Sequence, residues 1–101
     1  MIKIKLEKEG STIKKIVITG HANYAEYGKD IVCAAVSATV LTTINGIIAL
    51  DDSILKTEQK QDKLIISINK IENISQTLIN NMINCLQELV IEYPKNIKIE
   101  I

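Results

Sequence analysis

The sequence predicts an α+β domain with elements in the order ββαββαβ, in which two helices pack on a mainly antiparallel sheet. Three observations lead to this prediction. Hydrophobic and polar residues alternate near both ends of the chain, a long apolar run follows Asp30, and a later run repeats apolar residues every three or four positions. The 101 residues suit one domain spanning residues 1–101, because a chain near this length buries roughly two-thirds of its unfolded surface.

The first 20 residues predict a β-hairpin. In "MIKIKLEKEG" the aliphatic residues share one face of a strand, and lysine and glutamate occupy the other face. A turn is expected at Glu9 and Gly10, after which the β-branched run "STIKKIVITG" forms a second strand that ends at Gly20. His21, the single histidine of the chain, therefore lies at the exit of this strand.

The run "DIVCAAVSATVLTTINGIIAL" is apolar nearly all round and predicts a buried helix over residues 31–49. Asp30 is its expected N-cap, because a carboxylate there accepts unpaired amide hydrogens of the first turn. Cys33 is then the third residue of the helix. Residues 22–29 fit neither the two-residue alternation of a strand nor the three-and-four spacing of a helix. They are expected to form a loop, with Gly20 and Gly28 as its hinges.

The second half of the chain predicts a hairpin, a helix and a last strand. Two short strands flank "QKQD", and residues 74–93 then have the spacing of an amphipathic helix. Its expected apolar positions are Ile74, Leu78, Met82, Cys85, Leu86, Leu89, Val90 and Tyr93. Pro94 ends this helix, and "NIKIEI" alternates again as a strand.

Composition narrows the classes of function. The chain is 47% hydrophobic without Phe or Trp, which predicts an aliphatic core. Twelve basic residues balance twelve acidic ones, so a contact with nucleic acid would be local. The lysines of the first hairpin are most simply a solvated face, and a weak contact with ribosomal RNA is the alternative. With no leader and no run of about 18 apolar residues, we expect a reduced cytoplasmic protein with free thiols and no membrane partner. One histidine and two distant cysteines predict neither a metal nor another cofactor.

Cys33 and His21 are the residues most suited to chemistry. The start of a helix favours an anion such as a thiolate, and a nine-residue loop can bring His21 to it. His21 would take the thiol proton and return it to a leaving amine, while amides near the helix start receive an oxyanion. Asp30 would either cap the helix or orient the imidazole. Ser37, one turn after Cys33, would line the site or bond its own backbone.

The same residues also have simpler interpretations. A cysteine in an apolar helix is commonly an inert core residue, and Cys85 is expected to be one. His21 could be an ordinary strand-end residue. Tyr24 and Tyr27 could anchor the loop or contact a bound peptide.

"GHANYAEYGKDIVCAAVSA", residues 20–38, closely resembles the signature of the ribosomal-processing cysteine proteases, the Prp family of bacteria. Its Gly-His pair, late loop glycine and Asp-Ile-Val-Cys-Ala-Ala-Val-Ser segment carry the resemblance. This implies a cytoplasmic homodimeric endopeptidase that removes the N-terminal extension of a large-subunit ribosomal protein equivalent to L27. By this resemblance Cys33 is the nucleophile, His21 its base and Asp30 an orienting or structural partner, and the loop at 22–29 yields to admit substrate.

The predicted site therefore has two groups of residues. Cys33, His21 and Asp30 are catalytic, and Gly20, Tyr24, Tyr27, Gly28 and Ser37 bind substrate or shape the loop. Two rival functions use the same motif: a non-enzymatic ribosome-associated binding module, in which the motif is a folding signature, and a redox sensor based on Cys33.

Overall fold

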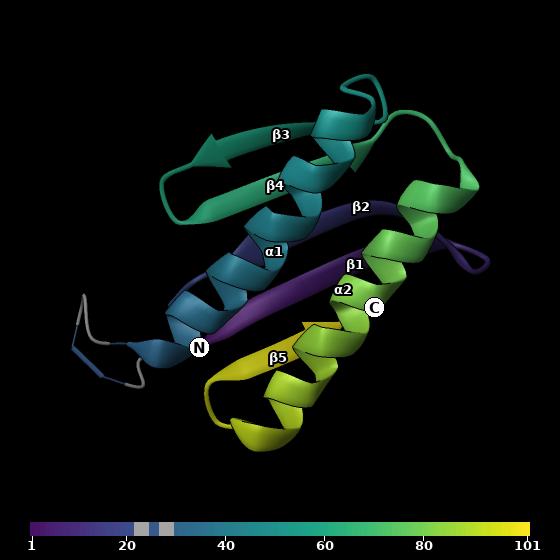
Figure 1. The fold of residues 1–101 in the computed structure, drawn as a ribbon. Helices are drawn as coiled ribbons and strands as arrows, with labels where there is room; N and C mark the ends of the chain where they lie inside the picture. Colours follow the sequence, from purple (N-terminus) through teal and green to yellow (C-terminus); the bar gives the residue numbers. More distant parts are fainter. Residues whose placement is uncertain (22–24, 27–29) are drawn as a thin grey trace.

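A computed structural model describes residues 1–21, 25–26 and 30–101, and it places two helices on one face of a five-stranded sheet (Figure 1). The elements are β1 (Ile2–Glu9), β2 (Thr12–Thr19), α1 (Ile31–Leu50), β3 (Leu55–Lys60), β4 (Lys63–Ile68), α2 (Asn73–Glu92) and β5 (Ile97–Glu100). The predicted α+β class and ββαββαβ order are confirmed.

The strands lie in the order β3-β4-β2-β1-β5. The pairs β1–β2, β2–β4 and β3–β4 are antiparallel, and β5 runs parallel to β1, so the sheet is mainly antiparallel as predicted. A parallel pair needs a crossover, and α2 carries the chain across the sheet before β5. The first hairpin turns at Gly10 and Ser11, one residue later than predicted, because β1 extends through Glu9.

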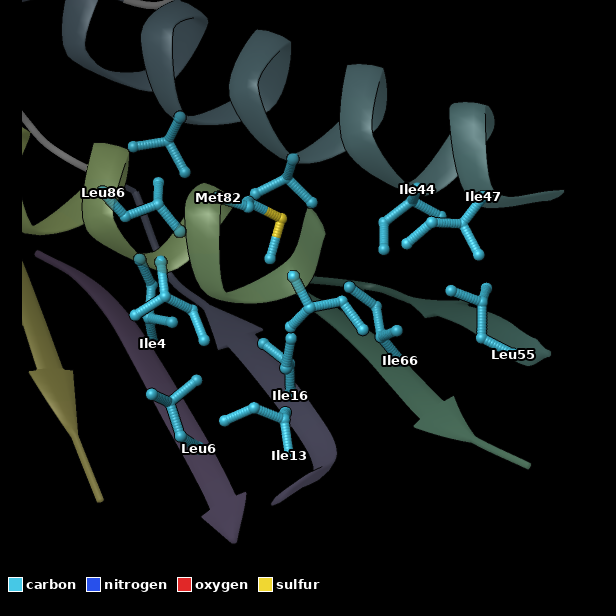
Figure 2. Close-up of a cluster of buried hydrophobic side chains, with 14 of the residues drawn as sticks. Ile4, Leu6, Ile13, Ile16, Ile44, Ile47, Leu55, Ile66, Met82 and Leu86 are labelled. Atoms are coloured by element: carbon cyan, nitrogen blue, oxygen red, sulfur yellow. The ribbon is translucent and has the colours of Figure 1, made fainter. Parts of the chain in front are cut away.

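The core lies between the sheet and the two helices (Figure 2). On β1, Ile2, Ile4 and Leu6 are buried while the residues between them are exposed, so the helices cover only one face of the sheet. The side chains with the least exposure are aliphatic apart from Ser75: Ile4, Ile13, Ile16, Ile47, Ile66, Ile79, Met82, Leu86, Ile97, Val32 and Val40. The predicted aliphatic core is confirmed.

Helix α1 is buried on one side only, which corrects the prediction of a buried helix. Its inward stripe consists of Val32, Val36, Val40, Ile44 and Ile47. The opposite side of α1 is apolar but exposed. The sheet packs against the inner side of α1, and α2 packs beside this helix (Figure 1). Nothing in the described chain covers the outer side of α1.

By length and composition alone, α1 is a helix that could cross a membrane, with a hydropathy of 2.0. The expectation that the chain has no apolar run of about 18 residues was therefore wrong. The core helix of a soluble protein passes the same test, and the valine stripe of α1 packs within this fold.

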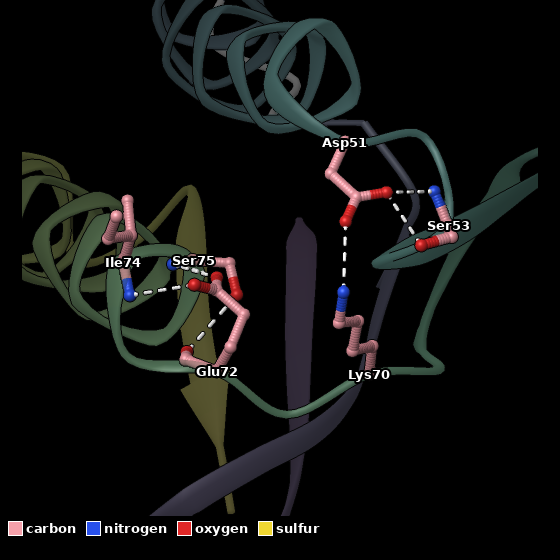
Figure 3. Close-up of polar contacts among 6 residues, drawn as sticks. All are labelled: Asp51, Ser53, Lys70, Glu72, Ile74 and Ser75. Atoms are coloured by element: carbon pink, nitrogen blue, oxygen red, sulfur yellow. Dashed lines mark hydrogen bonds and ion pairs between the residues drawn. The ribbon is translucent and has the colours of Figure 1, made fainter.

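Helix α2 begins after Glu72, whose carboxylate accepts hydrogen bonds from the amides of Ile74 and Ser75 (Figure 3). The Ser75 hydroxyl and amide lower the pKa of this carboxyl. The buried stripe of the helix is Ser75, Ile79, Met82, Ile83 and Leu86.

The predicted apolar face of α2 was therefore partly wrong. Ile74 is 62% exposed, and Cys85 is exposed rather than a core residue. Apolar residues cover more than half the circumference of this helix, so periodicity alone did not fix which of them face the sheet.

A polar contact joins the end of α1 to the segment before α2. The Asp51 carboxylate accepts hydrogen bonds from the Ser53 hydroxyl at 2.6 Å and amide at 2.9 Å, and from Lys70 Nζ at 3.1 Å (Figure 3). The hydroxyl bond contributes most to lowering the pKa of Asp51 to about 2. The contact fixes the chain where it leaves α1.

Candidate active site

Gly20 shapes the exit of β2. Its φ is +85°, and a Cβ at this position would lie 2.4 Å from the carbonyl oxygen of Met1. Glycine alone tolerates both this backbone conformation and this close approach. The turn at Gly20 directs the chain out of the sheet and so determines the position of His21.

His21 contacts a carboxylate that the sequence analysis did not identify. His21 Nε2 lies 3.1 Å from Asp62 Oδ1, and both side chains are more than half exposed. The amide of Gly20 also donates to the carbonyl oxygen of Asp62 at 3.2 Å. Asp62 therefore holds the β2 exit through its backbone and its side chain together.

Asp62 was missed because it is distant in sequence. It lies in the turn between β3 and β4, 41 residues after His21. The "QKQD" turn was predicted, but its position beside His21 depends on the pairing of β4 with β2, which aligns Lys63 with Thr19. Sequence patterns do not specify which non-adjacent strands pair.

Asp30 caps α1, one of the two roles that the sequence left open. Its Oδ1 accepts from the amides of Val32 and Cys33, each at 3.0 Å. The cap fixes the first turn, so Cys33 is the third residue of the helix as predicted. It also occupies two of the amides that were expected to receive an oxyanion.

One pocket of about 280 Å³ brings together four of the predicted residues, and Asp30 is not among the described residues that line it. Cys33 is half-buried, and it lines this pocket with Gly20, His21, Ser37 and Asp62. Helix α1 contributes the cysteine and serine, β2 leads into the histidine, and the β3–β4 turn contributes Asp62. The arrangement places a thiol, an imidazole and a carboxylate around a common space.

The pocket has an aliphatic floor and a polar rim. Ile2, Ile18, Val36, Val40, Leu41 and Leu64 supply its apolar lining. Gln59, Gln61 and Lys63 add polar groups from the second hairpin. The pocket therefore offers an apolar subsite directly beside the thiol.

Neither cysteine forms a disulfide, and the two have different surroundings. Cys33 is half-buried at the pocket, whereas Cys85 is exposed on α2. Within residues 1–21, 25–26 and 30–101, no group of three His, Cys, Asp or Glu side chains is arranged to hold a metal ion. The predictions for Tyr24, Tyr27 and Gly28 lie outside the described residues.

The chain is similar to known proteases along its length. The profile of the family "Cysteine protease Prp" matches residues 1–98. The ribosomal processing cysteine protease Prp of Staphylococcus aureus strain Mu50 is 31% identical over 101 residues, which cover 97% of this chain and 94% of that protein. Its namesake in Bacillus subtilis is 54% identical over 33 residues, 33% of this chain and 30% of that protein.

Solved structures agree with the sequence comparisons. The crystal structure of S. aureus Prp with a covalently linked product peptide has a TM-score of 0.91 and 28% identity, covering 99% of this chain and 98% of that chain. The same protease with a substrate peptide has a TM-score of 0.82 and 25% identity, covering 99% and 98%. SMU.848 from Streptococcus mutans has a TM-score of 0.79 and 26% identity, covering 99% and 92%.

Proposed function

Because the chain belongs to the Prp family of ribosomal processing cysteine proteases, we propose that it removes the N-terminal extension of a large-subunit ribosomal protein equivalent to L27. The convergence of Cys33 and His21 on one pocket carries the proposal. A relative of similar fold binds a substrate peptide and a covalently linked product peptide, which supports a peptide as the partner.

In the proposed reaction Cys33 is the nucleophile and His21 is the general base. His21 accepts the thiol proton, and the thiolate attacks the carbonyl carbon of the scissile bond. As the carbon–nitrogen bond breaks, the imidazolium gives its proton to the leaving amine. Water, deprotonated by the same imidazole, then hydrolyses the thioester and restores the thiol.

The start of α1 favours this thiolate. Cys33 lies in the first turn, where the partial positive charge of the helix is concentrated. Asp30 acts here as a structural residue, because its carboxylate holds the amides of Val32 and Cys33 and so fixes the first turn. While these bonds persist, the oxyanion receives its hydrogen bonds from other donors.

Asp62 is the positioning residue for His21 in this mechanism. Its carboxylate engages Nε2, which leaves Nδ1 as the ring nitrogen available to the thiol of Cys33. The second bond from Gly20 to the Asp62 carbonyl fixes the β3–β4 turn against the β2 exit. We assign to Asp62 the orienting role that the sequence analysis considered for Asp30.

The pocket also indicates how a substrate is held. An extended peptide crossing the mouth of the pocket would place one apolar side chain on the floor formed by Ile18, Val36, Val40 and Leu64. Ser37, exposed on the next turn after Cys33, is placed to contact the peptide backbone beside the thiol.

Mass spectrometry of the ribosomal precursor tests the proposal. The precursor is incubated under reducing conditions with wild type, Cys33→Ala or Cys85→Ala. We expect wild type and Cys85→Ala to make one cut near the precursor's N-terminus and Cys33→Ala to make none. Cys85 is the matched control because it is the other free thiol and lies outside the pocket. An uncut precursor with folded wild type, or a cut by Cys33→Ala, would refute the assignment.

We also propose that the protein is a homodimer that pairs through the exposed side of α1. Ile31, Ala38 and Ala49 form an exposed apolar stripe there, opposite the buried residues of the helix. A second copy offers the same apolar stripe and would cover it. Sedimentation equilibrium should give a dimer for wild type and a monomer for Ala38→Lys/Ala49→Lys. The control Ile91→Lys, at an 81% exposed residue of α2, should remain dimeric, and a monomeric wild type contradicts the pairing.

A cytoplasmic location is part of the same proposal. Thiols stay reduced in the cytoplasm, and neither Cys33 nor Cys85 forms a disulfide. Cell fractionation followed by immunoblotting tests it: recovery in the soluble cytoplasmic fraction is expected. Recovery with membranes would instead favour a membrane role for α1, whose length and composition permit one.

A further inference from the structure

The face of the sheet opposite the helices carries a row of lysines. Strand register aligns Lys60 with Lys63, Lys63 with Thr19, Thr19 with Lys3, and Lys3 with Lys98. The row crosses all five strands, and with strands about 4.8 Å apart it spans roughly 19 Å. Lys3 is exposed between the buried residues Ile2 and Ile4, so the row lies on the uncovered face.

This face has an excess of positive charge. By the same alternation it holds seven lysines and four glutamates: Lys3, Lys5, Lys15, Lys56, Lys60, Lys63, Lys98, Glu7, Glu9, Glu58 and Glu100. The net charge of these residues is therefore +3, although that of the whole chain is 0. The rest of the chain carries the compensating −3.

Each glutamate of this face pairs with a lysine: Glu7 with Lys15 at 4.0 Å, Glu9 with Lys14 at 3.6 Å, Glu58 with Lys60 at 3.7 Å and Glu100 with Lys98 at 3.4 Å. Among the described residues, Lys3, Lys5 and Lys63 have no ion pair. All three line one shallow hollow, together with Glu7 and Glu100. These three ammonium groups are available to an anionic partner.

We propose that this face binds the phosphate backbone of RNA. Neighbouring ammonium groups on a flat sheet suit a chain of phosphates, whose charge complements the face. None of the five strands contains an aromatic residue, so the face cannot stack bases and binding is independent of sequence. Its apolar residues, Val17 and Ile65, are half-buried, so it lacks the protruding apolar anchors of a membrane-binding surface.

The row borders the candidate active site. A second hollow at the row is lined by Lys3, Lys60 and Lys63 together with Gly20 and Asp62, which also line the pocket containing Cys33. RNA on this face would therefore hold the protease with its pocket at the edge of the RNA. Such a contact would raise the local concentration of a protein substrate already bound to the same RNA.

Fluorescence anisotropy with a labelled 20-nucleotide RNA of mixed sequence tests the proposal. For three or four phosphates engaged, the slope of log K against log salt is about −2 to −3. The variant Lys3→Gln/Lys5→Gln/Lys63→Gln should bind at least about tenfold more weakly at low salt and lose most of this slope. The control Lys8→Gln/Lys70→Gln/Lys95→Gln has the same charge change away from the face and should bind within about threefold of wild type.

Each outcome bears on the proposal. Equal losses in the two triple variants would show that only net charge matters and would overturn it, as would binding without salt dependence. Wild-type binding to phosphatidylserine vesicles or polyglutamate that matches its binding to RNA would also overturn it. Thermal unfolding verifies that each variant is folded. The assay does not measure cleavage, so its result is independent of the proposed protease function.

Discussion

Replacing Gly20 with alanine should destabilise the fold far more than the same replacement at Gly10. Both glycines have positive φ, +85° at Gly20 and +62° at Gly10, so an alanine at either position costs about 1–2 kcal/mol of backbone strain. At Gly10 the new methyl group meets no atom within 4 Å. At Gly20 it would lie 2.4 Å from the Met1 carbonyl oxygen.

The Met1 carbonyl cannot move away freely. The next residue, Ile2, is 4% exposed, and its amide donates to the Asn96 carbonyl at 2.8 Å. Forcing a methyl group into such packing costs a further 1–3 kcal/mol or so. Loss of unfolded-state entropy offsets about 0.4–1 kcal/mol in each variant. The expected net loss is therefore about 1 kcal/mol for Gly10→Ala and about 2–4 kcal/mol for Gly20→Ala.

Thermal unfolding by circular dichroism measures this difference. For a domain of this size, 1 kcal/mol corresponds to about 4–8 °C in Tm. Gly10→Ala should lower Tm by about that amount and Gly20→Ala by about 10–25 °C. Equal Tm values for the two variants would refute the argument that the approach of Met1 requires glycine at position 20.

Three further predictions address the site, the polar contacts and the core. Asp62→Asn should lower kcat about fivefold at unchanged KM, because an exposed ion pair contributes at most about 1 kcal/mol. Asp62→Glu should restore kcat. An unchanged kcat of Asp62→Asn in steady-state peptide cleavage would exclude a positioning role. The pKa of Asp51 is lowered from 3.8 to about 2, so its contacts stabilise the fold above pH 4 and are lost as pH falls toward 2. In thermal melts the Tm advantage of wild type over Asp51→Asn should therefore shrink between pH 4 and 2, and a constant difference would contradict this linkage. Ile16→Ala, at a side chain with 0% exposure, should lower the free energy of unfolding in urea by about 2–5 kcal/mol. Ile91→Ala, at a side chain with 81% exposure, should change it by no more than about 0.5 kcal/mol. Similar losses in the two variants would show that the core is misplaced.

Local patterns were sufficient to predict the elements. Alternation along β1, the N-cap at Asp30 and the stop at Pro94 depend on residues close in sequence, and the structure places the elements within one or two residues of their predicted bounds. The orientation of the two helices was harder to predict. Both are apolar over more than one face, so only packing on the sheet decided that the outer side of α1 and Cys85 on α2 face outward.

In the candidate site, too, some features follow from local sequence and others depend on the tertiary structure. His21, Asp30 and Cys33 lie within 13 residues of one another, and the sequence by itself determined that they follow a strand and begin a helix. Only the tertiary structure decided that Asp62 meets the imidazole. The same is true of the lysine row, whose four lysines come from β1, β3, β4 and β5. Both depend on strand pairing between distant segments, which is set by burial of the whole core rather than by any local pattern.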